Sequence, residues 1–167
     1  MRMRAKHILA IVVVAIIAAA ALFFSRPAAA PEVRFATLAG ESLATSDLRG
    51  KVVLVNFWAT SCVTCVKEMP MLVETHRKFA PRGYATVAVA MSYDHPNFVA
   101  EYVQKNRLPF HVALDTSGEV AKGFGGVSLT PTTFILDRHG RIVKRYLGEP
   151  DEGDLHALLE KTLSDPA

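Results

Sequence analysis

Residues 52–70 read VVLVNFWATSCVTCVKEMP, and this stretch decides the fold. Its first part, residues 52–58, is an almost unbroken apolar run, as expected of a strand buried on both faces. From Cys62 to Phe79 the apolar residues recur at a helical period. The stretch therefore predicts a buried strand over 52–58 that passes through a short loop into a helix over 62–79.

The chain has only two cysteines, Cys62 and Cys65, and both lie at this strand-to-helix junction. Two residues three apart in the first helical turn lie on one face, close enough to form a disulfide. The unpaired N–H groups and the positive end of the helix dipole stabilise a thiolate there. We therefore expect reversible dithiol–disulfide chemistry, with Cys62 as the exposed nucleophile and Cys65 as the resolving thiol.

Two other uses of the cysteine pair are open on the residues alone. A structural disulfide is disfavoured because so small a ring removes little entropy from the unfolded chain. A zinc site needs four ligands, whereas this chain offers one C-x-x-C and six scattered histidines without an H-x(3–5)-H pair. Redox chemistry is the favoured interpretation.

Residues 1–26 are expected to form an N-terminal membrane anchor or an uncleaved signal. Arg2, Arg4 and Lys6 precede an uncharged apolar run over 8–24. As a helix this run would be about 25 Å long, near the thickness of a bilayer core. The basic flank orients the N-terminus towards the cytoplasm. The sequence thus predicts a single-pass protein of the cytoplasmic membrane, with its catalytic domain on the oxidising, periplasmic side.

The segment after the apolar run bears on whether the anchor is retained. Residues 28–30 are three alanines that resemble a signal-peptidase site, but Pro31 would occupy the first mature position and opposes cleavage. We expect a retained anchor, with a cleaved signal as the alternative. A tether over 27–31 and one domain over 32–167 would follow.

Charge excludes one class of function. From Ala28 onward the chain has 15 Lys and Arg against 16 Asp and Glu, and the basic residues form no stripe or run. Proteins that bind nucleic acid through its phosphates carry such basic patches. Nucleic acid is therefore not an expected partner.

Predicted strands and helices alternate along the rest of the chain. Strands are expected over 32–38, 84–91, 110–114, 132–136 and 141–147, and one helical turn over 119–124. A last helix is expected to be capped near Asp151, with Leu155, Leu158, Leu159 and Leu163 on one face. This order predicts an α/β sandwich with a mixed sheet.

The segment after residue 91 predicts one more helix. Pro96 suits a first helical position, and Asp94 is the expected cap before it. The expected buried face of this helix consists of Phe98, Val99, Tyr102 and Val103.

The stretch over 52–70 resembles the active-site segment of membrane-anchored thioredoxin-like proteins of the TlpA/ResA type. The run LTPTTFILD over 129–137 resembles their second signature, and the likeness extends from Val33 to the C-terminal helix. The resemblance implies a thioredoxin-like mixed sheet flanked by helices. Within it, residues 84–106 would be an inserted βα unit.

The resemblance also implies further site residues. In thioredoxin folds the proline of the second signature follows a cis peptide bond and packs against the C-x-x-C, which points to Thr130–Pro131. The backbone of Thr130 would then dock the client chain. Trp58 is expected to shield Cys62 and Cys65 from beneath, and we group it with Thr130 and Pro131 as substrate-binding.

Glu68 stands where ResA-like members keep an active-site glutamate, one helical turn beyond Cys65. We expect it to support proton transfer at Cys65, since a carboxyl in a partly apolar site titrates nearer neutrality. The alternative is an exposed glutamate paired with Lys or Arg.

The chain departs from plain thioredoxins at Asn56, where they carry a buried aspartate, and at Ser61, where they carry tryptophan. Thr64 stands at a position where many thioredoxins and TlpA-like proteins have a proline.

Taken together, the resemblance implies a thiol-disulfide oxidoreductase that needs no cofactor and no metal. Its expected clients are proteins with disulfides or thiols, such as apocytochrome c or copper-site assembly proteins. Its expected electron donor is a membrane reductase of the DsbD/CcdA kind. Two alternatives are a peroxiredoxin-like peroxidase, for which the Thr/Ser-x-x-Cys site is missing, and a Sco-like copper-delivery protein, which spaces its cysteines C-x-x-x-C.

Overall fold

The computed structural model describes residues 27–165 of the chain. The anchor expected over 1–26 lies outside the described residues. None of the helices within 27–165 is both long enough and apolar enough to span a bilayer.

A five-stranded mixed sheet, in the order β5-β4-β3-β6-β7, forms the centre of the fold. Strand β3 (Val52–Trp58) lies in the middle, parallel to β4 (Tyr84–Ala90), which is parallel to β5 (His111–Leu114). On its other side β6 (Thr132–Leu136) runs antiparallel to β3, and β7 (Ile142–Leu147) antiparallel to β6. Because β3 is covered on both faces, all seven of its residues are buried.

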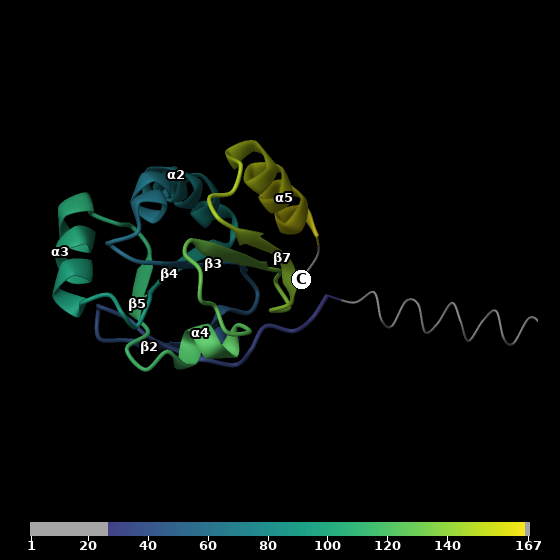
Figure 1. Ribbon diagram of the computed structural model, residues 1–167. Helices are drawn as coiled ribbons and strands as arrows, with labels where there is room; N and C mark the ends of the chain where they lie inside the picture. The colour runs from purple at the N-terminus through teal and green to yellow at the C-terminus, as the bar shows by residue number, and fades with distance from the viewer. Residues whose placement is uncertain (1–26, 166–167) are drawn as a thin grey trace, which may run out of the picture.

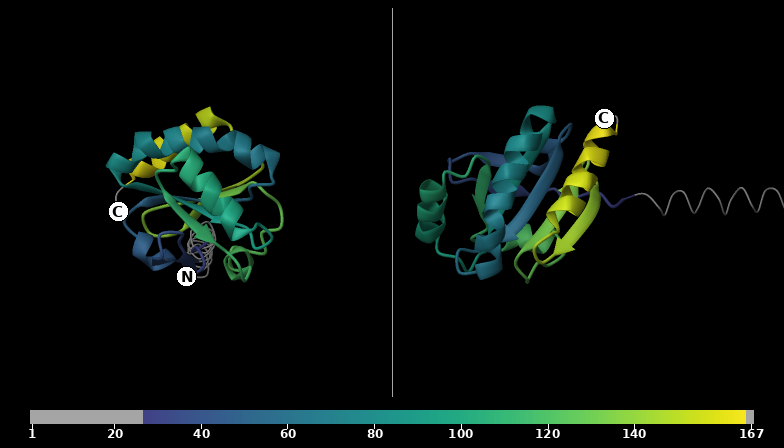
Figure 2. Two further views of the ribbon diagram at one scale, coloured as in Figure 1. Left: turned by 90° about the vertical axis from the view of Figure 1, so that its left-hand side faces the viewer. Right: turned by 90° about the horizontal axis from the view of Figure 1, so that it is seen from above.

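Helices cover both faces of this sheet (Figures 1 and 2). Helices α2 (Val63–Phe79) and α5 (Glu152–Ser164) lie side by side over one face, with α3 (Pro96–Asn106) beyond them near β5. The opposite face carries α4 (Glu119–Gly123) and the N-terminal hairpin of β1 (Arg34–Ala36) and β2 (Ser42–Ala44). Two short 3-10 helices, η1 (Thr45–Leu48) and η2 (Ala80–Arg82), complete the described elements.

Two apolar cores lie on the two faces of β3. Leu54 and Trp58 point into the core shared with α2 and α5. Val55 and Phe57 point into the core shared with β1 and α4. This alternation follows from the period of two along a strand. It also fixes which side chains of β3 lie beneath α2, and therefore beneath the cysteines.

The predicted fold class is confirmed: a thioredoxin-like mixed sheet flanked by helices. The strand predicted over 52–58 matches β3, and Asp151 caps α5 by accepting the N–H of Asp154 at 2.9 Å. The strand expected over 32–38 is shorter, because β1 pairs with β2 over only three residues.

Two expectations about α3 are wrong. Its N-cap is His95, whose side chain accepts the N–H of Asn97, whereas Asp94 binds elsewhere. Phe98 is 61% exposed, although Val99 from the same predicted face is fully buried. The helix flanks the edge of the sheet, so only a narrow arc of its surface meets the core.

Part of the expected tether belongs to the folded domain. The N–H of Ala30 donates to the carbonyl of Gly140, and the N–H of Ile142 donates to the carbonyl of Ala28, both at 2.8 Å. The chain therefore docks beside the start of β7 before it enters β1.

Candidate active site

The cysteine pair lies where β3 ends and α2 begins. The N–H of Cys62 donates to the carbonyl of Ala59 at 3.1 Å, which closes a turn between the two elements. Cys62 is the N-cap of α2, and its Sγ accepts the N–H of Cys65 at 3.2 Å. The two residues form a disulfide with their Cα atoms 5.2 Å apart.

The two sulfurs differ in access. Cys62 is partly exposed, whereas Cys65 is fully buried in the core beneath α2. Val63 between them is 83% exposed, so the approach to Cys62 is open. A client sulfur can reach Cys62 first, and Cys65 only through Cys62. The predicted roles of Cys62 as nucleophile and Cys65 as resolving thiol require this order of access and stay predictions.

Glu68 is fully buried one turn below Cys65, which overturns the alternative of an exposed glutamate. Its Oε1 accepts a hydrogen bond from the side-chain amide of Asn56 at 2.9 Å. The same amide nitrogen donates to Oγ1 of Thr133 at 3.0 Å, on the neighbouring strand β6. Within residues 27–165, Oε2 of Glu68 has no hydrogen-bond partner. A proton on the neutral carboxyl would therefore sit on Oε2.

Burial raises the pKa of Glu68 to about 7. The hydrogen bond from Asn56 acts in the opposite direction because it favours the charged form, and the charge of Glu149 adds a smaller upward effect. A carboxyl that is half protonated near neutrality can both accept and return a proton. The raised pKa and the position one turn from Cys65 support the role of Glu68 as a proton acceptor, which stays a prediction.

Trp58 is fully buried in the same core as Cys65, and its ring packs against Tyr102 with the centroids 5.2 Å apart. It lies beneath the dithiol, as a shielding residue would. Its side chain has no exposed surface with which to touch a client protein. Direct substrate contact by Trp58, one of the expectations from the sequence, does not fit this burial.

The second signature lies beside the dithiol loop. The Thr130–Pro131 peptide bond is cis, as expected. Strand β6 begins at Thr132, which pairs with Phe57, so the preceding proline lies next to the end of β3. Thr130 is half-buried, and its Oγ1 lies 3.2 Å from the hydroxyl of Tyr93. The backbone of Thr130 thus stands at the edge of the site.

Sequence reasoning missed two neighbours of this site, Tyr93 and Asp94, in the loop between β4 and α3. Tyr93 contacts Thr130, and the carboxylate of Asp94 accepts two hydrogen bonds from Thr60. One signal could have pointed to them. They lie just after the strand predicted over 84–91. Because parallel neighbouring strands end at the same edge of a sheet, the end of this strand is expected beside the cysteine loop, which follows the strand over 52–58.

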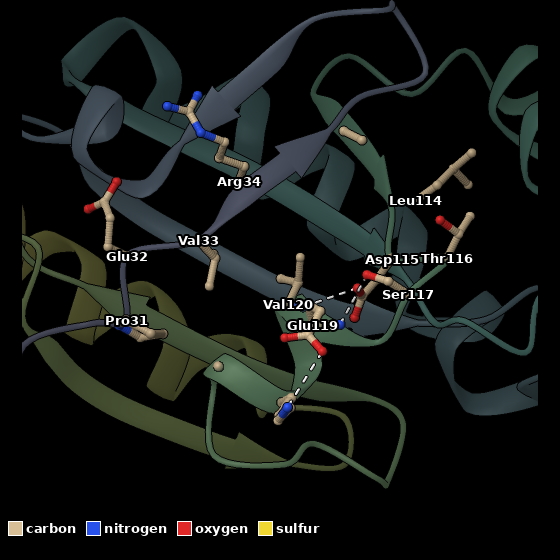
Figure 3. A pocket seen from close by; sticks show the side chains of 13 residues that line it. Pro31, Glu32, Val33, Arg34, Leu114, Asp115, Thr116, Ser117, Glu119 and Val120 are labelled. Atoms are coloured by element: carbon tan, nitrogen blue, oxygen red, sulfur yellow. Dashed lines mark hydrogen bonds and ion pairs between the residues drawn. The ribbon is translucent and has the colours of Figure 1, made fainter.

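A cavity of about 620 Å³ lies away from the dithiol, on the face of the sheet that carries α4 (Figure 3). Val33 and Val120 line it, together with Asp115. The Asp115 carboxylate accepts the N–H groups of Val120 and Ala121 and so begins α4. None of the predicted site residues borders this cavity.

Fold and site together define a thioredoxin-like protein with a redox-active cysteine pair. The chain belongs to the Redoxin family, whose profile matches residues 27–161. It is 35% identical over 133 residues to the thiol-disulfide oxidoreductase ResA of Bacillus anthracis, covering 79% of this chain and 75% of that protein. The ResA of Bacillus subtilis (strain 168) is 34% identical over 117 residues, which cover 70% and 64% of the two chains.

Solved structures of thiol-disulfide oxidoreductases and related proteins have the same fold. A thiol:disulfide interchange protein of the thioredoxin family from Chlorobium tepidum TLS superposes with a TM-score of 0.76 at 28% identity, covering 84% of this chain and 99% of that one. StoA from Bacillus subtilis superposes with a TM-score of 0.66 at 26% identity, covering 78% and 98%. The protein is thus a ResA-like thiol-disulfide oxidoreductase.

Proposed function

We propose that this protein reduces disulfides of client proteins outside the cytoplasm through its Cys62–Cys65 dithiol. The observation that carries the proposal is the partly exposed Cys62 above a buried Cys65, with Glu68 one helical turn below. An accessible first sulfur, a protected second sulfur and an adjacent proton acceptor are the three parts that disulfide reduction needs.

The reaction would run in two exchange steps. The Cys62 thiolate attacks one sulfur of the client disulfide, forms a mixed disulfide and releases the other client sulfur as a thiolate. Cys65 then gives its proton to Glu68 and attacks the sulfur of Cys62. The Cys62–Cys65 disulfide forms, the second client sulfur leaves, and the client has gained two electrons.

The direction and place of this reaction rest on the family and on the N-terminal sequence. Each turnover requires a donor that returns two electrons to the disulfide, and we assign this role to a membrane reductase of the DsbD/CcdA kind. Apocytochrome c or copper-site assembly proteins would be the clients. The segment over 1–26 would keep the domain at the periplasmic face of the cytoplasmic membrane. Membrane fractionation with N-terminal sequencing tests this, and a soluble protein that begins near Pro31 would contradict it.

Insulin reduction in the presence of dithiothreitol tests the activity. We expect turnover by the wild-type protein and none by Cys62→Ser. Titration with copper(I) is the companion measurement, because a copper carrier would bind one equivalent tightly without turning over insulin. Tight copper binding without insulin turnover would replace the proposed function by metal delivery.

A further inference from the structure

The carboxylate of Asp94 engages both hydrogen-bond donors of Thr60. Its Oδ2 accepts the backbone N–H at 2.5 Å, and its Oδ1 accepts the hydroxyl at 2.7 Å. Asp94 is only 9% exposed. Because both oxygens accept hydrogen bonds, the group shows the pattern of an ionised carboxylate. These bonds join the β4–α3 loop to a turn that lies 34 residues earlier in the sequence.

Thr60 lies within the turn that positions the nucleophile. This turn is closed by the bond from the N–H of Cys62 to the carbonyl of Ala59, and Cys62 then caps α2. The loop that holds Asp94 is itself fixed to the end of β3. The N–H of Asp94 donates to the carbonyl of Met91 at 2.9 Å, and the N–H of Met91 donates to the carbonyl of Trp58 at 3.0 Å. The buried Asp94 carboxylate is therefore hydrogen-bonded to Thr60, which lies two positions before Cys62 in the sequence.

The charge on Asp94 is not neutralised by an ion pair within residues 27–165. Lys67, the basic residue closest along α2 to the cysteines, is paired with Glu149 at 2.8 Å. The ring of His95, which follows Asp94, accepts the N–H of Asn97 as the cap of α3.

The two other groups of the described site, within residues 27–165, carry no positive charge. Glu68 on α2 is acidic, and the second-signature loop contributes Thr130, which is uncharged and contacts Tyr93. The dipole of α2 favours a thiolate at its N-terminus, whereas a nearby carboxylate acts in the opposite direction.

We propose that the Asp94 carboxylate, held on the cysteine turn by Thr60, destabilises the Cys62 thiolate and so keeps the Cys62–Cys65 couple at a reducing potential. The thiolate stabilises the dithiol form, and a couple whose reduced form is stabilised is an oxidant. A group that disfavours the thiolate shifts the equilibrium of the couple towards the disulfide. The dithiol then gives up its electrons to the client more readily. Asp94 is thus a positioning residue, and the inference rests on the proposed function because it explains the reducing direction.

Asp94→Asn tests the proposal, because it keeps the size of the side chain and removes the charge. We expect its equilibrium with glutathione to move about tenfold towards the dithiol, which is about 30 mV for this two-electron couple. In a Cys65→Ser background, alkylation of Cys62 by iodoacetamide should begin at lower pH than in the Asp94 parent. Asp94→Ser, a second uncharged variant, gives the same readouts if the asparagine variant folds poorly.

Thr60→Val is the matched control, because it removes one hydrogen bond and leaves the charge in place. We expect its glutathione equilibrium to stay within about twofold of the wild type, well short of the tenfold change that removal of the charge produces. The proposal is wrong if the uncharged variants keep the wild-type potential, or if Thr60→Val shifts it as far as Asp94→Asn. Insulin reduction by the wild type separates this failure from a failure of the proposed function, which would show no turnover at all.

Discussion

Asn56 and Glu68 form a buried hydrogen bond of 2.9 Å between the central strand and the helix that carries the dithiol. The bond holds Oε1 of the carboxyl, and Thr133 holds the amide from the far side at 3.0 Å. Cys65 lies one turn above Glu68 on the same helix. The Glu68 carboxyl is therefore held against the sheet, one helical turn below Cys65.

The first prediction concerns the proton transfer itself. Glu68→Gln keeps a group that can accept the Asn56 bond but cannot take a proton from Cys65. We expect insulin reduction at neutral pH to slow about 100-fold, the scale of general-base catalysis. The inflection near pH 7 in the pH–rate profile should disappear with it.

Glu74→Gln is the control for this variant, because Glu74 lies on the same helix but is exposed and paired with Arg77. Its rate and pH profile should match the wild type. An unchanged pH profile in Glu68→Gln would remove Glu68 from the mechanism.

A second prediction isolates Asn56. Asn56→Leu removes the hydrogen bond that favours the charged carboxyl, so the pKa of Glu68 should rise above its value of about 7. Loss of a hydrogen bond to a charged group corresponds to a rise of about one to two pH units. Carbon-13 NMR of the glutamate carboxyls measures it, with Glu68→Gln to assign the resonance. Thr133→Val, which leaves the Asn56 bond in place, should give a smaller rise, and a fall in either variant contradicts the account.

The third prediction is a dependence of stability on pH. The folded protein keeps a proton on Glu68 up to about pH 7, whereas the unfolded chain releases it near the ordinary value of 4.5. The stabilisation is therefore fully present below pH 4.5 and is lost as the pH rises through the folded value. The loss in the free energy of unfolding is at most about 3 kcal/mol.

Urea unfolding of the disulfide form at a series of pH values measures this loss. Glu68→Gln should flatten the decline while leaving the contributions of other groups in place. A wild-type protein that gains stability relative to Glu68→Gln between pH 4.5 and 7 would show the opposite sign and contradict a raised pKa.

Local sequence signals predicted the elements that build this site. The almost unbroken apolar run of β3 is typical of a central strand covered on both faces. The position of Glu68 one turn beyond Cys65 predicted that the two residues lie on the same side of α2. The structure adds that Glu68 is buried, and this burial raises its pKa. These features depend on spacing along the chain.

Features that depend on contacts between residues far apart in the sequence could not be predicted from local patterns. Asp94 looked like a helix cap, but folding brings it against Thr60, and His95 takes the cap. Phe98 has helical spacing for burial, yet the edge position of α3 leaves it exposed. The link from Asn56 to Thr133 joins residues 77 positions apart and exists only because β6 pairs with β3 in that register.

The central claim is that Cys62 attacks the client and Cys65 resolves the complex. Trapping tests it most directly, with insulin as the disulfide client and mass spectrometry of the covalent product. Cys65→Ser should accumulate a mixed disulfide on Cys62, because nothing remains to release it. Cys62→Ser should form almost none, since Cys65 is fully buried. A mixed disulfide that forms on Cys65 as fast as on Cys62 would contradict the assignment of the two roles.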